Sequence, residues 1–359
     1  MSGPKVDIAA PVDESGATHE RMKRAGINLK IPSMSWMDMA NIRHRYDVQF
    51  DADTDAAACV ANKTMTVTRK SLEGAPNLRL VAFYTVGFDN IDLDAATERG
   101  VLVVHSPTEP NWGGVAEGTM ANILAILKKV REKDRFIKAG GWRDRSLQGQ
   151  YFGPRQMDSY EGLTVGIIGL GRIGGRVADL LAPWRVKLIG YDPYVDDSLF
   201  VHHNVRRVDL DSLLKQSDIV TIHCNLTKET HKLIGAKQLA MMKKTAILAN
   251  HARGNIIDID ALADALDADR IASAILDVLP EEPPPADLRF LKMGDKVLLS
   301  PHMVSNNVGT GLNMAAPWVE QAIYDVLAGK IPKHVVNPDI IPQWLARFGG
   351  KNLLAAAAA

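Results

Sequence analysis

The stretch Leu163-Thr164-Val165-Gly166-Ile167-Ile168-Gly169-Leu170-Gly171-Arg172-Ile173-Gly174 decides the fold of this 359-residue chain. Its first half is an apolar run that predicts a buried strand, and its second half reads G-x-G-x-x-G before a helix-like stretch. Gly169 permits the tight turn, Gly171 lets the backbone approach a pyrophosphate, and Gly174 lets the helix pack on the strand. A helix N-terminus also offers unpaired N–H groups to phosphates. The stretch therefore predicts a dinucleotide site.

A carboxylate lies where a second contact to the dinucleotide is expected. The apolar run Val186–Tyr191 ends in Asp192, 18 positions after Gly174. An acid there accepts hydrogen bonds from the adenosine ribose and repels the extra phosphate of NADP. We therefore expect NAD rather than NADP. The competing explanation is an ordinary glycine turn with an acid nearby by chance.

Strand-like runs recur through the second half of the chain. They lie at Leu163–Gly169, Val186–Tyr191, Ile219–Cys224, Thr245–Asn250, Ile271–Leu276 and Lys296–Ser300, and helix-like stretches separate most of them. Six such runs with helical crossovers predict a doubly wound parallel sheet.

The first hundred residues predict a second, smaller parallel sheet. Its expected strands are Val6–Ala10, Ala57–Val60, Leu78–Phe83 and Val101–Val104. The run Ile31–Phe50 is harder to interpret, and we expect its Met34, Trp36, Met37 and Met39 to fill core.

A breaker-rich stretch, Ser106–Gly114, predicts a crossing between domains. A long helix is expected after it, from Val115 to about Ala139. Apolar residues at positions 120, 123, 124 and 127 share one helix face, which fits either a subunit contact or a buried core helix. A further helix is expected over Gly311–Leu327.

Composition bounds the class of protein. Hydrophobic residues make up 46% and charged residues 23%, and 42 basic residues balance 42 acidic ones. This balance is typical of a globular domain and predicts no nucleic-acid or membrane partner. The two cysteines, Cys59 and Cys224, form no CxxC pair, and no apolar run approaches the ~20 residues of a membrane span. We therefore expect a cytoplasmic protein with no metal site.

Three segments that could carry chemistry each follow a predicted strand. Arg253 lies in Asn250–Gly254, and its fork could bind a substrate carboxylate and polarise the neighbouring carbonyl. His302 is a natural proton donor for reducing a ketone, and Glu282 could orient its ring. Taken singly, Arg253 could be a surface fork and His302 an ordinary turn residue.

Together these segments resemble the D-isomer-specific 2-hydroxyacid dehydrogenases, from about Leu78 to about Asn337. The resemblance implies that Arg253, Glu282 and His302 are catalytic, and that the amides of Val86 and Gly87 cradle the substrate carboxylate. It also implies a homodimer. The cofactor-binding residues that it implies are Gly169, Gly171, Arg172, Ile173, Gly174, Asp192, Cys224, His251, Ala252, Asp277 and His302.

The resemblance further implies an α/β architecture of two Rossmann-like domains. The cofactor domain, 112–303, is expected as an insertion into a discontinuous substrate domain, 1–111 plus 304–359, with the active site in the cleft between them. This chain departs from the family pattern at Thr85, His105, Asn225 and Met303–Asn307. None of these removes a proposed catalytic group, but they leave the substrate open.

The implied activity is reversible hydride transfer between NADH and a small 2-oxo acid such as glyoxylate or hydroxypyruvate. A phosphite- or formate-type dehydrogenase is one alternative, although formate enzymes carry Gln where this chain has Glu282. Another is a non-catalytic NADH-sensing scaffold. A phosphoglycerate enzyme is less favoured because many of those add a regulatory domain after the catalytic core.

Overall fold

The chain forms two compact units. The computed structural model describes residues 3–41, 46–49, 55–309 and 311–354. The first unit comprises Met1–Asn111 and Val308–Ala359, and the second comprises Trp112–Asn307. The chain therefore leaves the first unit once and returns to it once.

The second unit is built on a seven-stranded sheet in the order β10-β9-β8-β11-β12-β13-β14, and all its pairings are parallel. Its strands are β8 (Thr164–Ile168), β9 (Lys187–Tyr191), β10 (Arg206–Arg207), β11 (Ile219–Ile222), β12 (Ile247–Asn250), β13 (Ser273–Leu276) and β14 (Val297–Leu299). The sequence predicts six of these strands, and only the two-residue edge strand β10 is missed.

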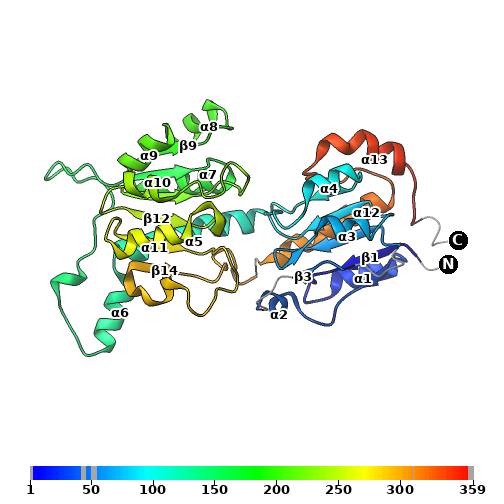
Figure 1. Ribbon diagram of the computed structural model, residues 1–359, viewed down its shortest axis with the longest axis horizontal. Helices are drawn as coiled ribbons and strands as arrows, with labels where there is room; N and C mark the ends of the chain where they lie inside the picture. The colour runs from blue at the N-terminus through cyan, green and yellow to red at the C-terminus, as the bar shows by residue number, and fades with distance from the viewer. Residues whose placement is uncertain (1–2, 42–45, 50–54, 310, 355–359) are drawn as a thin grey trace. The chain divides into compact units, whose positions relative to one another are not determined.

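Helices cover both faces of this sheet (Figure 1). They are α5 (Glu109–Leu127), α6 (Val130–Lys138), α7 (Arg172–Leu181), α8 (Asp197–His202), α9 (Leu210–Gln216), α10 (Ala236–Met241) and α11 (Ile259–Asp267). Side chains from α9, α10 and α11 pack with one face of the strands, and side chains from α5 and α7 pack with the other. Because both faces are buried, the strands read as continuous apolar runs, as parallel sheets do.

The first unit holds a five-stranded parallel sheet in the order β2-β1-β4-β6-β7. Its strands are β1 (Lys5–Ile8), β2 (Asn28–Lys30), β4 (Ala58–Ala61), β6 (Leu80–Phe83) and β7 (Leu102–Val104), and β3 (Tyr46–Asp47) pairs separately with β5 (Met65–Thr66). The helices of this unit are α1 (Ala17–Arg24), α2 (Trp36–Ala40), α3 (Arg69–Glu73), α4 (Leu93–Glu98), α12 (Ala316–Leu327) and α13 (Ile341–Phe348). The α/β class with two doubly wound parallel sheets is confirmed.

The expected helix Val115–Ala139 is wrong at its start and in its continuity. Helix α5 begins six residues earlier, at Glu109, and includes Gly114 and Gly118. A Cβ on Gly114 would lie 3.2 Å from Ser305 Cα, and one on Gly118 would lie 2.8 Å from Val304 O. The lack of a side chain at these glycines lets the segment at Val304 and Ser305 pack closely against α5, and the helix continues through both of them.

The same helix breaks at Lys129, whose φ is 51°. The Gln150 amide donates to the carbonyl of Leu127 at 2.8 Å, so a distant segment satisfies a carbonyl in the last turn of α5. Met120, Ile123 and Leu127 are buried in the core of the second unit. The apolar face of α5 is therefore a core face.

The Met/Trp cluster fills core only in part. Trp36 is buried, whereas Met34 is 41% exposed. Met37 and Met39 are partly buried, and each packs against a different hydrophobic cluster of the first unit. Residues 42–45 and 50 of the same run lie outside the described residues.

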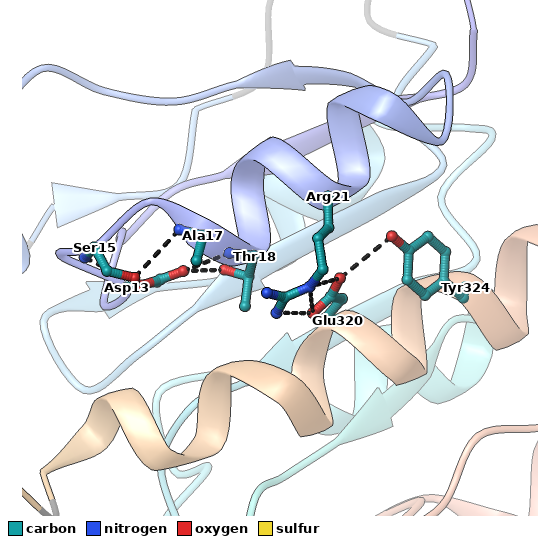
Figure 2. A network of polar contacts seen from close by, with 7 residues as sticks. All are labelled: Asp13, Ser15, Ala17, Thr18, Arg21, Glu320 and Tyr324. Carbon is teal, nitrogen blue, oxygen red and sulfur yellow. Dashed lines mark hydrogen bonds and ion pairs between the residues drawn. The ribbon is translucent and has the colours of Figure 1, made fainter.

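A polar network joins α1 to α12 within the first unit (Figure 2). Arg21 donates from Nη2 to Glu320 Oε2 at 2.6 Å and from Nε to Glu320 Oε1 at 3.0 Å. Asp13 accepts hydrogen bonds from the Thr18 amide and from the side chains of Ser15 and Thr18. Burial acts to raise the pKa of Asp13, but these hydrogen bonds outweigh it and lower that pKa to about 2. The network ties α12 to α1, although nearly 300 positions separate Arg21 from Glu320.

Candidate active site

The register of the large sheet brings most of the predicted site residues to one edge. Tyr191, Ile168, Ile222, Asn250, Leu276 and Leu299 are successive register partners across six strands. The residues that directly follow these positions therefore share the carboxyl edge of the sheet, where open α/β sheets bind ligands. They include Gly169, Asp192, His223, His251 and Asp277.

The three motif glycines differ in their surroundings. Gly169 has φ +89°, and a Cβ there would lie 2.6 Å from the Cys224 amide nitrogen. A Cβ on Gly174 would lie 2.0 Å from the carbonyl oxygen of Gly169, so the helix packs directly on the turn. A Cβ on Gly171 would meet nothing within 4 Å. Gly171 therefore borders open space at the start of α7.

This open space fits a dinucleotide. Gly171 is the N-cap residue of α7, and Arg172 and Ile173 form the first helical turn. The N–H groups of that turn are available to an anion, and Gly171 leaves the approach to them clear. The residues present are therefore those that a bound pyrophosphate requires.

Asp192 connects the glycine turn to the end of β9. Its Oδ2 accepts from the Leu170 amide at 2.9 Å, and its Oδ1 accepts from the Tyr194 amide at 2.9 Å. Oδ1 also accepts from the Val195 amide at 3.3 Å, and because a carboxylate has about four acceptor positions, these three bonds leave capacity for a ribose hydroxyl. The side chain therefore has a structural role, holding the turn, as well as the predicted ribose contact.

His302 and Glu282 lie together. His302 Nδ1 is 2.7 Å from Glu282 Oε2, and Glu282 Oε1 accepts from the Leu279 amide at 3.0 Å. The His302 backbone is in the left-handed region, with φ 55°, and its amide donates to the Asp277 carbonyl at 2.8 Å. A non-glycine residue in this region is uncommon and is found at functional sites. The carboxylate can only accept, so Nδ1 carries a proton and Nε2 is left to exchange one.

Asp277 organises the segment that carries His302. Its Oδ1 accepts from Ser300 Oγ at 2.6 Å and from the Met303 amide at 3.2 Å. These bonds and the His302 amide bond fix residues 300–303 to the end of β13. Asp277 is 2% exposed, and its hydrogen bonds hold the segment that carries His302.

Arg253 projects from a tight turn after β12. The Asn250 side chain bridges the turn, donating to the Arg253 carbonyl at 2.9 Å and accepting from the Ala252 amide at 3.0 Å. Gly254 permits the turn to pack against the Glu282 segment, because a Cβ there would lie 2.0 Å from the Leu279 carbonyl carbon. The segments bearing Arg253 and Glu282 are therefore in direct backbone contact.

Two histidines, His251 buried and His223 half-buried, lie at the same edge. His251 is 5% exposed, and its Nε2 is 3.2 Å from Asn122 Nδ2 on α5. His223 lies 2.9 Å from Thr221 Oγ1 through its Nε2. Burial lowers the pKa of both imidazoles; the charge of His251 lowers that of His223 further, and Asp277 partly opposes the shift in His251. Both rings are therefore neutral near pH 7.

Cys224 is a thiol with no sign of activation. Burial raises its pKa to about 11, and its backbone packs against Gly169. Since the thiolate is the reactive form, a raised pKa argues against a nucleophilic role. Its contribution to the edge is through the main chain.

The predicted carboxylate loop lies in the first unit, after β6. Thr85 Oγ1 donates to the Gly87 carbonyl at 2.6 Å, and His105 Nδ1 lies 2.7 Å from the Val86 carbonyl oxygen. Val86 and Gly87 are half-buried. In the sequence, His105 is notable only as a departure from the family pattern. Nothing near it in the chain indicates that its ring contacts the carbonyl of Val86, 19 positions earlier.

Comparisons with known proteins identify the family. Residues 120–304 match the family model described as D-isomer specific 2-hydroxyacid dehydrogenase, NAD binding domain. The chain is 40% identical to a glyoxylate reductase of Thermofilum pendens over 291 residues, which are 80% of this chain and 83% of that relative. It is 34% identical to a D-3-phosphoglycerate dehydrogenase of Archaeoglobus fulgidus over 340 residues, but these cover 94% of this chain and only 60% of that relative.

A solved structure is similar over nearly its whole length. The D-lactate dehydrogenase from Aquifex aeolicus, complexed with NAD and lactic acid, superposes with a TM-score of 0.74 at 26% identity and covers 94% of this chain and 98% of that one. The matched family model is an NAD-binding domain, and the relatives are named reductases and dehydrogenases. The chain is therefore an NAD-dependent oxidoreductase. The chain belongs to the D-isomer-specific 2-hydroxyacid dehydrogenase family, as the sequence predicts.

Proposed function

We propose that this chain reduces a small 2-oxo acid, with glyoxylate as the first candidate, and that Arg253, Glu282 and His302 carry the reaction. The observation that supports the proposal most strongly is the His302–Glu282 pair, 2.7 Å apart, at the same sheet edge as the glycine motif. Glyoxylate comes first because the Thermofilum pendens relative carries the name glyoxylate reductase.

In this mechanism the protein positions the acid and moves one proton. The Arg253 fork binds the substrate carboxylate and polarises the adjacent carbonyl, and amides of the loop at Val86 and Gly87 add donors to the carboxylate. Bound NADH supplies the hydride. His302 gives the proton on Nε2 to the carbonyl oxygen as negative charge develops there, and Glu282 stabilises the imidazolium beforehand. Oxidation of the 2-hydroxy acid uses the same groups in reverse.

The cofactor preference that we propose is NAD over NADP. Asp192 supports it, because its carboxylate is fixed beside the glycine turn by the Leu170 amide. A fixed negative charge at this position would repel a 2′-phosphate.

We also propose a homodimer. The support is a run of exposed apolar side chains that follows α6: Trp142 is 75% exposed, Tyr151 52% and Met157 101%. Exposed aromatic groups of this kind are typical of protein–protein interfaces. Light scattering should report twice the chain mass, and a monomer at micromolar concentration would contradict the proposal.

The cytoplasm remains the expected location, because both cysteines are free thiols. Among the described helices, none is both long and apolar enough to cross a bilayer.

The test of the reaction is an NADH-oxidation screen with purified protein. The panel holds glyoxylate, hydroxypyruvate, pyruvate, 3-phosphohydroxypyruvate and branched 2-oxo acids, with phosphite and formate assayed in the NAD-reducing direction. The proposal is supported if the wild type reduces one 2-oxo acid and Arg253→Ala lowers kcat/KM for that acid. NADH binding without turnover of any 2-oxo acid contradicts it and favours the sensing scaffold, and turnover of phosphite alone favours that alternative.

A further inference from the structure

His105 and the loop after β6 are joined by a hydrogen bond that fixes the loop's direction. His105 Nδ1 lies 2.7 Å from the Val86 carbonyl oxygen. A carbonyl can only accept, so Nδ1 is the protonated nitrogen of this ring. His105 follows β7 and is half-buried, so a neighbouring strand end supplies the donor that holds the loop.

A second side chain holds the next carbonyl. Thr85 Oγ1 donates to the Gly87 carbonyl at 2.6 Å. A trans peptide is planar, so its C=O and its N–H point in opposite directions. Fixing the Val86 and Gly87 carbonyls therefore fixes the directions of the Gly87 and Phe88 amides.

Those two amides are available to a ligand. Within the part of the chain that the structure describes, neither the Gly87 nor the Phe88 amide donates a hydrogen bond to another residue. Both residues are partly exposed. Two neighbouring N–H groups with fixed directions form an anion site of the kind that backbone loops provide.

A row of rings restrains His105. The Phe88 ring meets His105 edge-on at 5.5 Å, and His105 meets His334 edge-on at 6.2 Å. Trp318, on α12, stacks on His334 with ring centroids 4.8 Å apart and an interplanar angle of 6°. The backbone supports the same contact, since Val104 and Val335 form an antiparallel bridge beside β7. Four rings thus run from the loop to α12.

We propose that His105 is a positioning residue, which holds the Val86–Gly87 peptide so that the Gly87 amide receives the substrate carboxylate, while Thr85 holds the next peptide and its Phe88 amide. His334 and Trp318 hold the ring in place. The inference rests on the proposed function, because it concerns the carboxylate of the same 2-oxo acid.

The test compares three variants in steady-state kinetics and in oxalate binding to the NADH complex by calorimetry. His105→Phe keeps a ring but removes the donor, and His105→Asn restores an N–H at nearly the same place. Ser106→Ala is the matched control, because its hydroxyl donates to the Phe83 carbonyl at 2.8 Å, outside the loop. The loss of one hydrogen bond predicts a rise in KM and in the oxalate Kd of about 3- to 10-fold in His105→Phe, with kcat and NADH affinity little changed.

The expected pattern is that His105→Asn behaves like the wild type and Ser106→Ala leaves KM unchanged. Equal KM and oxalate Kd in His105→Phe and wild type would overturn the inference, and so would an equal loss in folded His105→Asn. Oxalate binding is measured without any reaction, so the carboxylate site and the proposed reaction are tested independently. A wild type that binds oxalate but reduces no 2-oxo acid defeats the proposed reaction alone, and one that binds no oxalate defeats the carboxylate loop.

Discussion

The Nδ1 atom of His302 lies 2.7 Å from the Oε2 atom of Glu282, and the second oxygen of that carboxylate is held by the Leu279 amide. The acid is therefore fixed at both oxygens, and the imidazole has one orientation available to it. This relationship links a turn after β13 to a turn after β14. It also leaves Nε2 as the nitrogen that can transfer a proton.

The first prediction separates the two members of this pair. His302→Ala should lower kcat by about 10²- to 10⁴-fold, the usual range for losing a general acid. Glu282→Gln can still accept a hydrogen bond but lacks the charge that favours imidazolium, so it should lose less and shift the pH–rate profile to lower pH. Stopped-flow NADH oxidation measures both, and NADH affinity is the control. Near-normal turnover in His302→Ala would remove the histidine from the mechanism.

The second prediction uses the different surroundings of two glycines. Gly171→Ala places its methyl group in open space, so its melting temperature should match the wild type while NADH binding weakens. Gly174→Ala would place its methyl 2.0 Å from the Gly169 carbonyl, so it should lose stability, by about 1–3 kcal/mol from overpacking. Calorimetric unfolding and NADH titration distinguish the two. Unchanged NADH affinity in Gly171→Ala would show that this opening is not the pyrophosphate approach.

Much of the fold could be predicted from the sequence because buried parallel strands are continuous apolar runs. Ten of the predicted runs lie on strands, from Val6–Ala10 to Lys296–Ser300. The missed strand β2 reads Asn28-Leu29-Lys30, and its polar ends hide it. The sequence predicts the start of α5 too late because Pro110, Gly113 and Gly114 look like helix breakers until the segment at Ser305 is seen against Gly114.

The site was predictable to the extent that its residues follow strands. Arg253 and His302 lie three residues after the ends of β12 and β14, and Glu282 lies six after the end of β13, so the register of the sheet brings the segments that carry them to one edge. His105 and Asn122 were missed because each acts on a residue far along the chain, Val86 and His251 respectively. Nothing local to a histidine or an asparagine shows which carbonyl or ring it will meet.

The third prediction concerns cofactor choice. Asp192→Asn removes the negative charge and keeps one side-chain oxygen, which can accept from the Tyr194 amide, while its NH2 group cannot accept from the Leu170 amide. The variant should therefore bind NADH more weakly and use NADPH better, with a small fall in melting temperature from the lost turn contact. The ratio of kcat/KM for NADPH to that for NADH should rise by at least about tenfold, which corresponds to 1.4 kcal/mol. A ratio identical to that of the wild type would mean that Asp192 only holds the turn.

The fourth prediction follows from the neutral histidines, His223 and His251, at the sheet edge of the second unit. Burial lowers the pKa of His223 to about 3 in the folded protein, and burial lowers that of His251 in the same direction. An unfolded histidine titrates near 6.5. Above that pH neither state binds a proton, so these groups add no pH dependence. As the pH falls below it, the unfolded chain takes up protons that the folded chain does not, so the free energy of unfolding falls.

Each histidine contributes a slope of up to about 1.4 kcal/mol per pH unit, from about pH 6.5 down to its folded pKa. Urea unfolding between pH 7.5 and 5 measures the sum, to which His19 of the first unit adds in the same sense because its pKa is also lowered by burial. His223→Gln should reduce the slope by one such step, whereas His231→Gln, at an exposed position, should leave it unchanged. If the unfolding free energy stayed constant across this range, His223 and His251 would have to be charged in the folded protein, and the edge of the sheet would carry two positive charges beside Asp277.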